Sequence, residues 1–145
     1  NINKKKKKKR GFTLIELIIV IAILAILAAI LVPLMIGWIN EARTATANAN
    51  ARTVYSAATA TAASLLAQTP AQIPTASTTI ASDDTELTDA DLAFRTQMGV
   101  LLGADFTTTD NAVWEVTFDA NSVPTSTTFT NDTLGTIVGE YPVTP

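Results

Sequence analysis

Hydrophobic residues form one unbroken block near the start of the chain. The twenty-three residues from Leu17 to Ile39 carry no charge and are apolar apart from Pro33 and Gly37. As a helix they would span roughly 34 Å at about 1.5 Å per residue, which is enough to cross a bilayer. The pattern predicts a membrane-spanning helix over residues 12–39 that is apolar on every face, with a kink at Pro33.

The pattern becomes weaker and periodic after Asn40. Up to Ala67 the chain is rich in alanine and contains no glycine or proline, which favours continued helix. Mildly apolar residues recur there at spacings of three and four, at Ala51, Val54, Ala58, Ala62 and Leu65. We therefore expect residues 40–67 to form an amphipathic second half of the same helix, on which residues 68–145 pack as a globular region.

The globular region begins with a loop and continues with a short helix and strands. Prolines follow the long helix, so residues 68–82 are expected to form an extended loop, and Thr88 is a good N-cap for a short helix. Residues 113–119 alternate between apolar and polar, as a half-buried strand does. Further strands are predicted over 123–130, with Val123, Thr125, Thr127 and Phe129 on one face, and over 136–141.

These elements predict an α+β fold. A long N-terminal α-helix would pack on a small antiparallel sheet, a meander of about three strands. The short helix would contribute Leu92, Phe94, Met98 and Leu101 or Leu102 to the packing. The candidate core residues of the last third are Phe106, Trp114, Phe118, Phe129 and Ile137.

Charge fixes the expected orientation of the first helix. Seven basic residues, Lys4 to Arg10, precede the apolar block, so the N-terminus is expected in the cytoplasm and residues after the block outside. An ordinary secretory signal is disfavoured, because the block is too long and no small-residue cleavage site follows it closely. Glu16 stands out, since a carboxylate in an apolar helix costs roughly 2.5 to 3.5 kcal/mol on insertion scales and needs a partner or a function.

The N-terminal residues resemble the prepilin family, the precursors of type IV pilins and related pseudopilins. The resemblance rests on a basic leader that ends in Gly11, then Phe12-Thr13-Leu14-Ile15-Glu16, then an apolar segment that carries Pro33. It implies that residues 1–11 are a leader peptide, that prepilin peptidase cuts between Gly11 and Phe12, and that Phe12 is N-methylated. It also implies that Glu16 acts in assembly, through the amine that cleavage leaves at Phe12.

The resemblance further implies a structural role in a surface filament. The implied partners are other copies of the chain in a helical homopolymer, prepilin peptidase, a platform protein, cytoplasmic ATPases and the membrane. The subunit would stay in the cytoplasmic membrane until it joins an extracellular pilus, which would serve adhesion, twitching motility or DNA uptake. Two alternatives stay open, a pseudopilin of type II secretion or competence, and a single-pass anchored binding module.

The composition of the chain excludes several kinds of catalytic and binding site. The chain has no cysteine and no histidine. It therefore lacks the side chains for a thiol nucleophile, for acid–base catalysis by imidazole and for the common zinc-binding sites, so we expect neither an enzyme nor a cofactor. The missing cysteines also make it look more like a pilin of a Gram-positive, clostridial-type bacterium. Beyond Arg10 three arginines stand against all thirteen acidic residues, and this acidity disfavours direct nucleic-acid binding. The acidic cluster over residues 83–91 lacks the spacing of a calcium loop, so no metal site is expected there.

Overall fold

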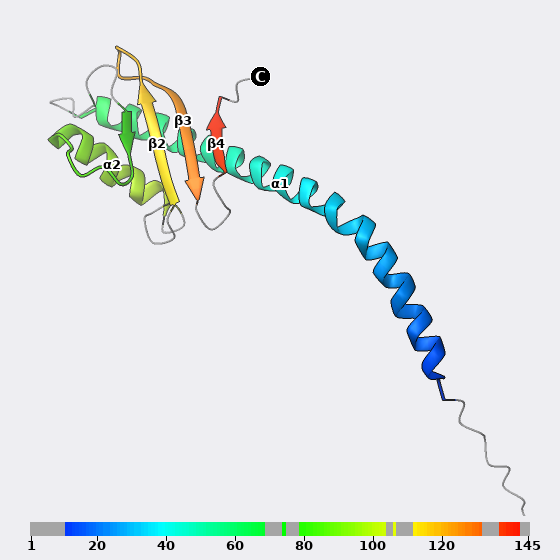
Figure 1. The fold of residues 1–145 in the computed structure, drawn as a ribbon. Coiled ribbons are helices and arrows are strands. Elements are labelled where there is room, and N and C mark those ends of the chain that lie inside the picture. The colour runs from blue at the N-terminus through cyan, green and yellow to red at the C-terminus, as the bar shows by residue number, and fades with distance from the viewer. Residues whose placement is uncertain are drawn as a thin grey trace, which may run out of the picture. The chain divides into compact units, whose positions relative to one another are not determined.

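The computed structural model describes residues 11–68, 74, 79–103, 106, 112–131 and 137–142. In this part of the chain two helices and four strands follow one another in the order α1, β1, α2, β2, β3, β4 (Figure 1). The fold is α+β, with a long N-terminal helix and a small antiparallel sheet, as the sequence predicts. The chain divides into two compact units between Ile39 and Asn40.

Helix α1 spans Leu14–Leu66, and its two halves have different surroundings. In the first half every large apolar side chain from Leu14 to Ile39 is at least 45 % exposed. In the second half a buried stripe confirms the predicted periodicity, with Ala47, Ala51, Val54, Ala58, Thr61, Ala62 and Leu65. Small alanines dominate this stripe, so the backbone of the sheet can approach the helix closely.

The sheet has four strands, one more than predicted. Its order is β1 (Thr79–Ala81), β2 (Ala112–Phe118), β3 (Pro124–Asn131) and β4 (Val138–Tyr141), and all neighbours are antiparallel. The last three strands were predicted, but the assignment of residues 79–81 to a loop is wrong. Strand β1 pairs with β2 and places Ile80, which is fully buried, against the core.

A bulge between β2 and β3 changes which residues of β3 face the core. Thr117 pairs with Ser126 while Phe118 pairs with Pro124, so the register between the two strands skips Thr125. One extra residue reverses the alternation of side chains along a strand. Pro124, Thr127 and Phe129 are therefore buried, and the prediction that Val123 and Thr125 share their face is wrong, because both are exposed.

Helix α2 spans Asp89–Leu102, and both of its ends follow from local sequence. Thr88 is the N-cap, as predicted, and forms a capping box with Asp91. Gly103, at φ 75°, is the C-cap, a backbone conformation that suits glycine. Phe94 and Met98 are buried as expected, and of Leu101 and Leu102 it is Leu102 that packs against the core. Leu92 is 45 % exposed, contrary to prediction.

The core lies between the sheet and the two helices of this second unit. Trp114, Phe118 and Phe129 are buried as predicted, and the ring of Phe94 meets that of Phe118 edge to face at 5.0 Å. Phe106 is partly buried against Phe129, with ring centroids 5.4 Å apart. Ile137 is only half-buried and lies outside the core cluster, so its assignment to the core is wrong.

Polar contacts attach β3 and β4 to α1. The buried hydroxyl group of Thr127 donates a hydrogen bond to the carbonyl oxygen of Ala51 at 2.7 Å. The backbone N–H of Glu140 donates to Oδ1 of Asn48 at 3.1 Å. These two bonds and the aromatic core together fix the sheet on the helix.

Candidate functional site

The start of α1 is a capping box formed by Thr13 and Glu16. The backbone N–H of Glu16 donates to Oγ1 of Thr13 at 3.3 Å, and Oε2 of Glu16 accepts from the backbone N–H of Thr13 at 2.8 Å. The hydroxyl group of Thr13 donates to the same Oε2 at 2.7 Å. Two backbone N–H groups that a helix start leaves unpaired are therefore satisfied reciprocally.

The capping box gives Glu16 a partner within its own chain. Hydrogen bonds to a charged group stabilise its charged form, so the two bonds from Thr13 offset part of the cost of a carboxylate at the start of an apolar helix. The sequence predicts that Glu16 needs a partner or a function, and the structure shows that Thr13 is a partner. The spacing Thr-x-x-Glu before an apolar run is the signal that identifies a capping box from sequence.

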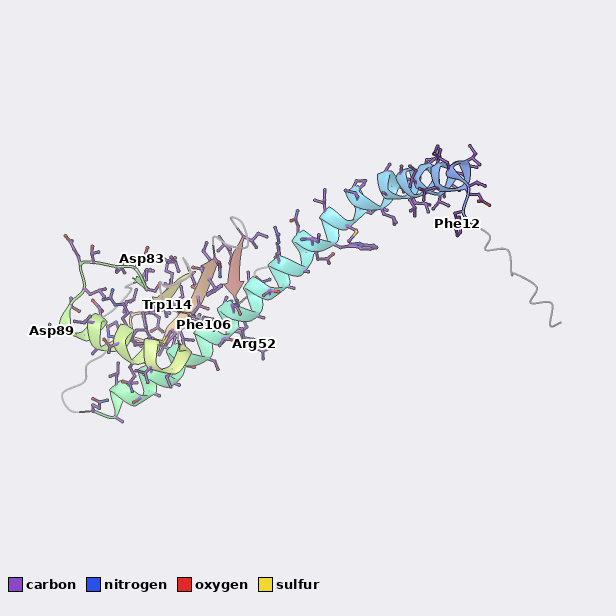
Figure 2. All side chains as sticks on the ribbon, turned by 90° about the horizontal axis from the view of Figure 1, so that it is seen from below. Phe12, Arg52, Asp83, Asp89, Phe106 and Trp114 are labelled. Atoms are coloured by element: carbon purple, nitrogen blue, oxygen red, sulfur yellow. The ribbon has the colours of Figure 1, made fainter. Side chains whose placement is uncertain are left out.

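Gly11 and Phe12 precede the helix and are not part of it. Both lie before the first helical residue, Leu14, and the side chain of Phe12 is 90 % exposed at this end of the chain (Figure 2). A Cβ atom added to Gly11 would meet none of the described residues within 4 Å. The described part of the fold therefore leaves room for a side chain at Gly11, so the requirement for glycine that the resemblance implies would come from a molecule that binds here.

The structure does not pair Phe12 with Glu16. Glu16 contacts Thr13, while the nitrogen of Phe12 is a peptide amide in the unprocessed sequence and carries no charge. The ion pair implied by the resemblance needs the amine that cleavage would create. It stays a prediction about the processed chain.

The apolar first half of α1 has the length and composition of a membrane span. In the described residues one helix, α1, meets that criterion, and none of its most apolar stretch is buried within the chain. Figure 2 shows the side chains of this stretch projecting on every side of the helix. An apolar surface of this kind has to be covered by lipid or by other apolar helices.

Pro33 lies inside this apolar stretch. The helix continues on both sides of it. Proline has no backbone N–H and removes one hydrogen bond from the helix interior. The kink predicted there remains a prediction.

The acidic cluster near the start of α2 has structural partners. Oδ2 of Asp84 accepts from the backbone N–H of Ala81 at 2.8 Å, and the carbonyl oxygen of Asp84 accepts from the guanidinium of Arg95 at 2.5 Å. Asp91 is the acidic member of the second capping box, whereas Asp83 and Asp89 are exposed (Figure 2). No group of three or more acidic residues is arranged to hold a metal ion in the described part of the chain.

Comparison with known proteins identifies one motif. The family model of the prokaryotic N-terminal methylation motif matches residues 6–32. Neither the curated proteins nor the solved structures gave a match. The matched segment contains Gly11, Phe12, Thr13 and Glu16 and continues into the exposed apolar half of α1, so the N-terminal part of this chain carries the methylation motif of pilin-like precursors.

Proposed function

We propose that this chain is the precursor of a type IV pilus subunit. Prepilin peptidase would remove residues 1–11 by cutting between Gly11 and Phe12, and the new N-terminus at Phe12 would be methylated. The observation that supports this most is the overlap of the methylation motif with the exposed apolar half of α1. An apolar helix surface that nothing in its own unit covers could lie in the membrane before assembly and in the core of a filament afterwards.

Assembly would exchange one apolar environment for another. Burial of apolar surface is driven by its removal from water, so a helix that moves from lipid into a bundle of equivalent helices keeps that contribution. Polar contacts would then set the register between copies, and Glu16 is the acidic residue of the first half of α1. A platform protein and cytoplasmic ATPases would be needed to drive extraction from the membrane.

The test is the N-terminal sequence of surface fibres. Fibres sheared from cells should contain a chain that begins with methylated Phe12, identified by mass spectrometry. Gly11→Val should leave the precursor folded, since a Cβ atom at Gly11 meets none of the described residues within 4 Å, yet block its cleavage. Abundant fibres that retain Lys4 to Arg10 would contradict the proposal.

Two other functions predict different products. A pseudopilin of type II secretion or competence would be cleaved and methylated in the same way but would form short fibres, which electron microscopy distinguishes from long pili. A membrane-anchored binding module would keep its leader and remain a monomer. The methylation motif favours the cleaved products over the anchored module.

A further inference from the structure

Arg52 lies in a groove between the second half of α1 and the end of β4. Besides Arg52, the groove is lined by Asn48, Ala49, Thr53, Ser56 and Tyr141. The guanidinium group of Arg52 lies over the ring of Tyr141, 6.0 Å from its centroid, and the ring centroids of Tyr55 and Tyr141 are 5.0 Å apart. Stacking uses the face of a guanidinium group and leaves the N–H groups along its edge for a carboxylate.

Arg52 is one of three arginines beyond Asn40, and each has different surroundings. Arg95 donates to the carbonyl oxygen of Asp84, so its guanidinium group has a partner within its own unit. Arg43 is exposed on α1, and no ring orients it among the described residues. Arg52 is therefore the arginine that is both exposed and held in place by a ring.

Exposed carboxylates lie on another part of the same unit. Asp83, Glu86 and Asp89 are exposed, whereas the other two acidic residues between 83 and 91 accept hydrogen bonds within the chain. This acidic segment follows β1 at one edge of the sheet, while the groove lies beside β4 at the other edge. Figure 2 shows Asp83 and Asp89 apart from Arg52. One unit therefore carries two separate surfaces of opposite charge.

The charge of the unit limits how two copies can meet. Beyond Asn40 the chain has no lysine, three arginines and every acidic residue except Glu16, so two copies repel each other unless opposite charges are brought together. A contact between the groove of one copy and the acidic segment of another joins two different surfaces. A head-to-tail contact of this kind can repeat along an open chain of copies.

We propose that the groove around Arg52 binds the exposed carboxylates of residues 83–89 of a second copy. The proposal rests on the proposed function, because it assigns a contact between neighbouring subunits of a fibre. A guanidinium group and a carboxylate can form two parallel hydrogen bonds, which fix orientation as well as charge. The contact would therefore select one arrangement of globular units, which the packing of apolar helices alone does not specify.

A charge-exchange experiment tests the contact. Each variant is expressed as the sole copy of the chain, and mass spectrometry gives the ratio of chain in sheared fibres to processed chain in the membrane. Arg52→Glu reverses the charge in the groove, and Arg43→Glu makes the same change on the same helix outside it. Arg52→Glu is then combined with arginine at each of the three exposed carboxylates in turn. The matched control combines it with Glu115→Arg, an exposed position on β2 outside the acidic segment.

The expected result is a loss that only the acidic segment can repair. Arg52→Glu should enter fibres at least about tenfold less than the wild type, since a charge-assisted contact becomes a repulsive one. Arg43→Glu should stay within about threefold, as for an ordinary surface charge. At least one exchange with Asp83, Glu86 or Asp89 should restore incorporation to within about threefold. Unchanged thermal melting of the detergent-solubilised variants would show that they fold like the wild type.

Several results would overturn the proposal. Normal incorporation of Arg52→Glu would show that the groove makes no contact, and failure of all three exchanges would show that residues 83–89 are not its partner. An equal loss for Arg43→Glu, or equal restoration by Glu115→Arg, would mean that net charge alone controls assembly. A wild-type chain that is uncleaved or forms no fibres refutes the proposed function instead, and this outcome is visible before any variant is compared.

Discussion

Thr61 on α1 and Thr127 on β3 are both fully buried, but only one hydroxyl group has a partner. Thr127 donates to Ala51, whereas Oγ1 of Thr61 has no hydrogen-bond partner in the described structure. Burial of an unpaired hydroxyl group destabilises a fold, and a formed hydrogen bond contributes roughly 0.5 to 1.5 kcal/mol. The same Thr→Val replacement should therefore have opposite effects at the two positions.

Thr61→Val should raise the free energy of unfolding by about 1 kcal/mol, and Thr127→Val should lower it by about the same amount. Valine has the shape of threonine, so the two variants are matched controls for each other. Thermal unfolding of the detergent-solubilised chain, followed by near-ultraviolet circular dichroism of the buried Trp114, measures both. Equal shifts in the same direction would contradict this reading of the two hydroxyl groups.

Gly139 on β4 is the position where the sheet approaches α1 most closely among the described glycines. A Cβ atom there would lie inside the backbone of Ala47 and Asn48, and neither neighbour is a flexible side chain that can move aside. Gly139→Ala should therefore lower the free energy of unfolding by about 3 kcal/mol. Gly99→Ala on α2 is the control, since a Cβ atom there meets nothing within 4 Å and alanine favours helix, so it should raise stability by about 0.5 to 1 kcal/mol.

A carboxylate in the turn between β2 and β3 makes the free energy of unfolding depend on pH. Oδ1 of Asp119 accepts from the backbone N–H groups of Val123 and Asn121, both at 2.8 Å. The bond from Val123, followed by those from Asn121, holds the pKa of Asp119 below its usual value. Because the folded-state pKa is lowered, this stabilisation is present above the unfolded pKa of about 3.9 and is lost as the pH falls through the folded pKa.

Asp119→Asn tests this assignment. Asparagine keeps an oxygen acceptor but does not titrate, so the melting temperature of the variant should fall less between pH 6 and pH 3 than that of the wild type. Comparing the two chains cancels the contribution of the other carboxylates. An equal fall in melting temperature for the two chains over this pH range would show that Asp119 does not cause the pH dependence.

The elements that the sequence predicted are those with a long or distinctive pattern. The second half of α1, the N-cap at Thr88 and the alternation of β2 each rest on several residues that indicate the same element. Strand β1 has three residues and only one large apolar side chain, Ile80, so its pairing with β2 decides its structure. The bulge at Thr125 depends on how two strands meet, which no pattern within one strand contains.

The candidate site was predicted in part for a similar reason. The resemblance singled out Gly11, Phe12 and Glu16, but the role of Thr13 depends on a contact between two side chains at a helix start. The Thr-x-x-Glu spacing indicates that contact, whereas the resemblance does not. The constraint on Gly139 could not be read in this way, because it comes from Ala47, which is ninety-two residues away in the chain.

At the scale of the whole molecule, the distribution of charge predicts how the chain reacts with amine reagents. All six lysines of the sequence lie before Gly11, so removal of residues 1–11 would leave the amine of Phe12 as the only amino group within residues 12–145. Amine-reactive dyes should therefore label the precursor strongly and fibres poorly. The measurement is dye per chain, with the precursor of the Gly11→Val variant as the positive control, and strong labelling of this chain in fibres would mean that the lysines are retained.

The attachment of the sheet to α1 also determines how the globular unit would respond to a pulling force. Gly139 rests on Ala47, Thr127 is bonded to Ala51, and β4 is bonded to Asn48, so three contacts fall within about one turn and a half of the helix. Sliding the sheet along the helix axis would break these contacts in the same movement, because all three lie within this short stretch of the helix. We therefore expect β3 and β4 to resist shear along the helix axis together. Under tension the sheet should detach from α1 in one step, not strand by strand.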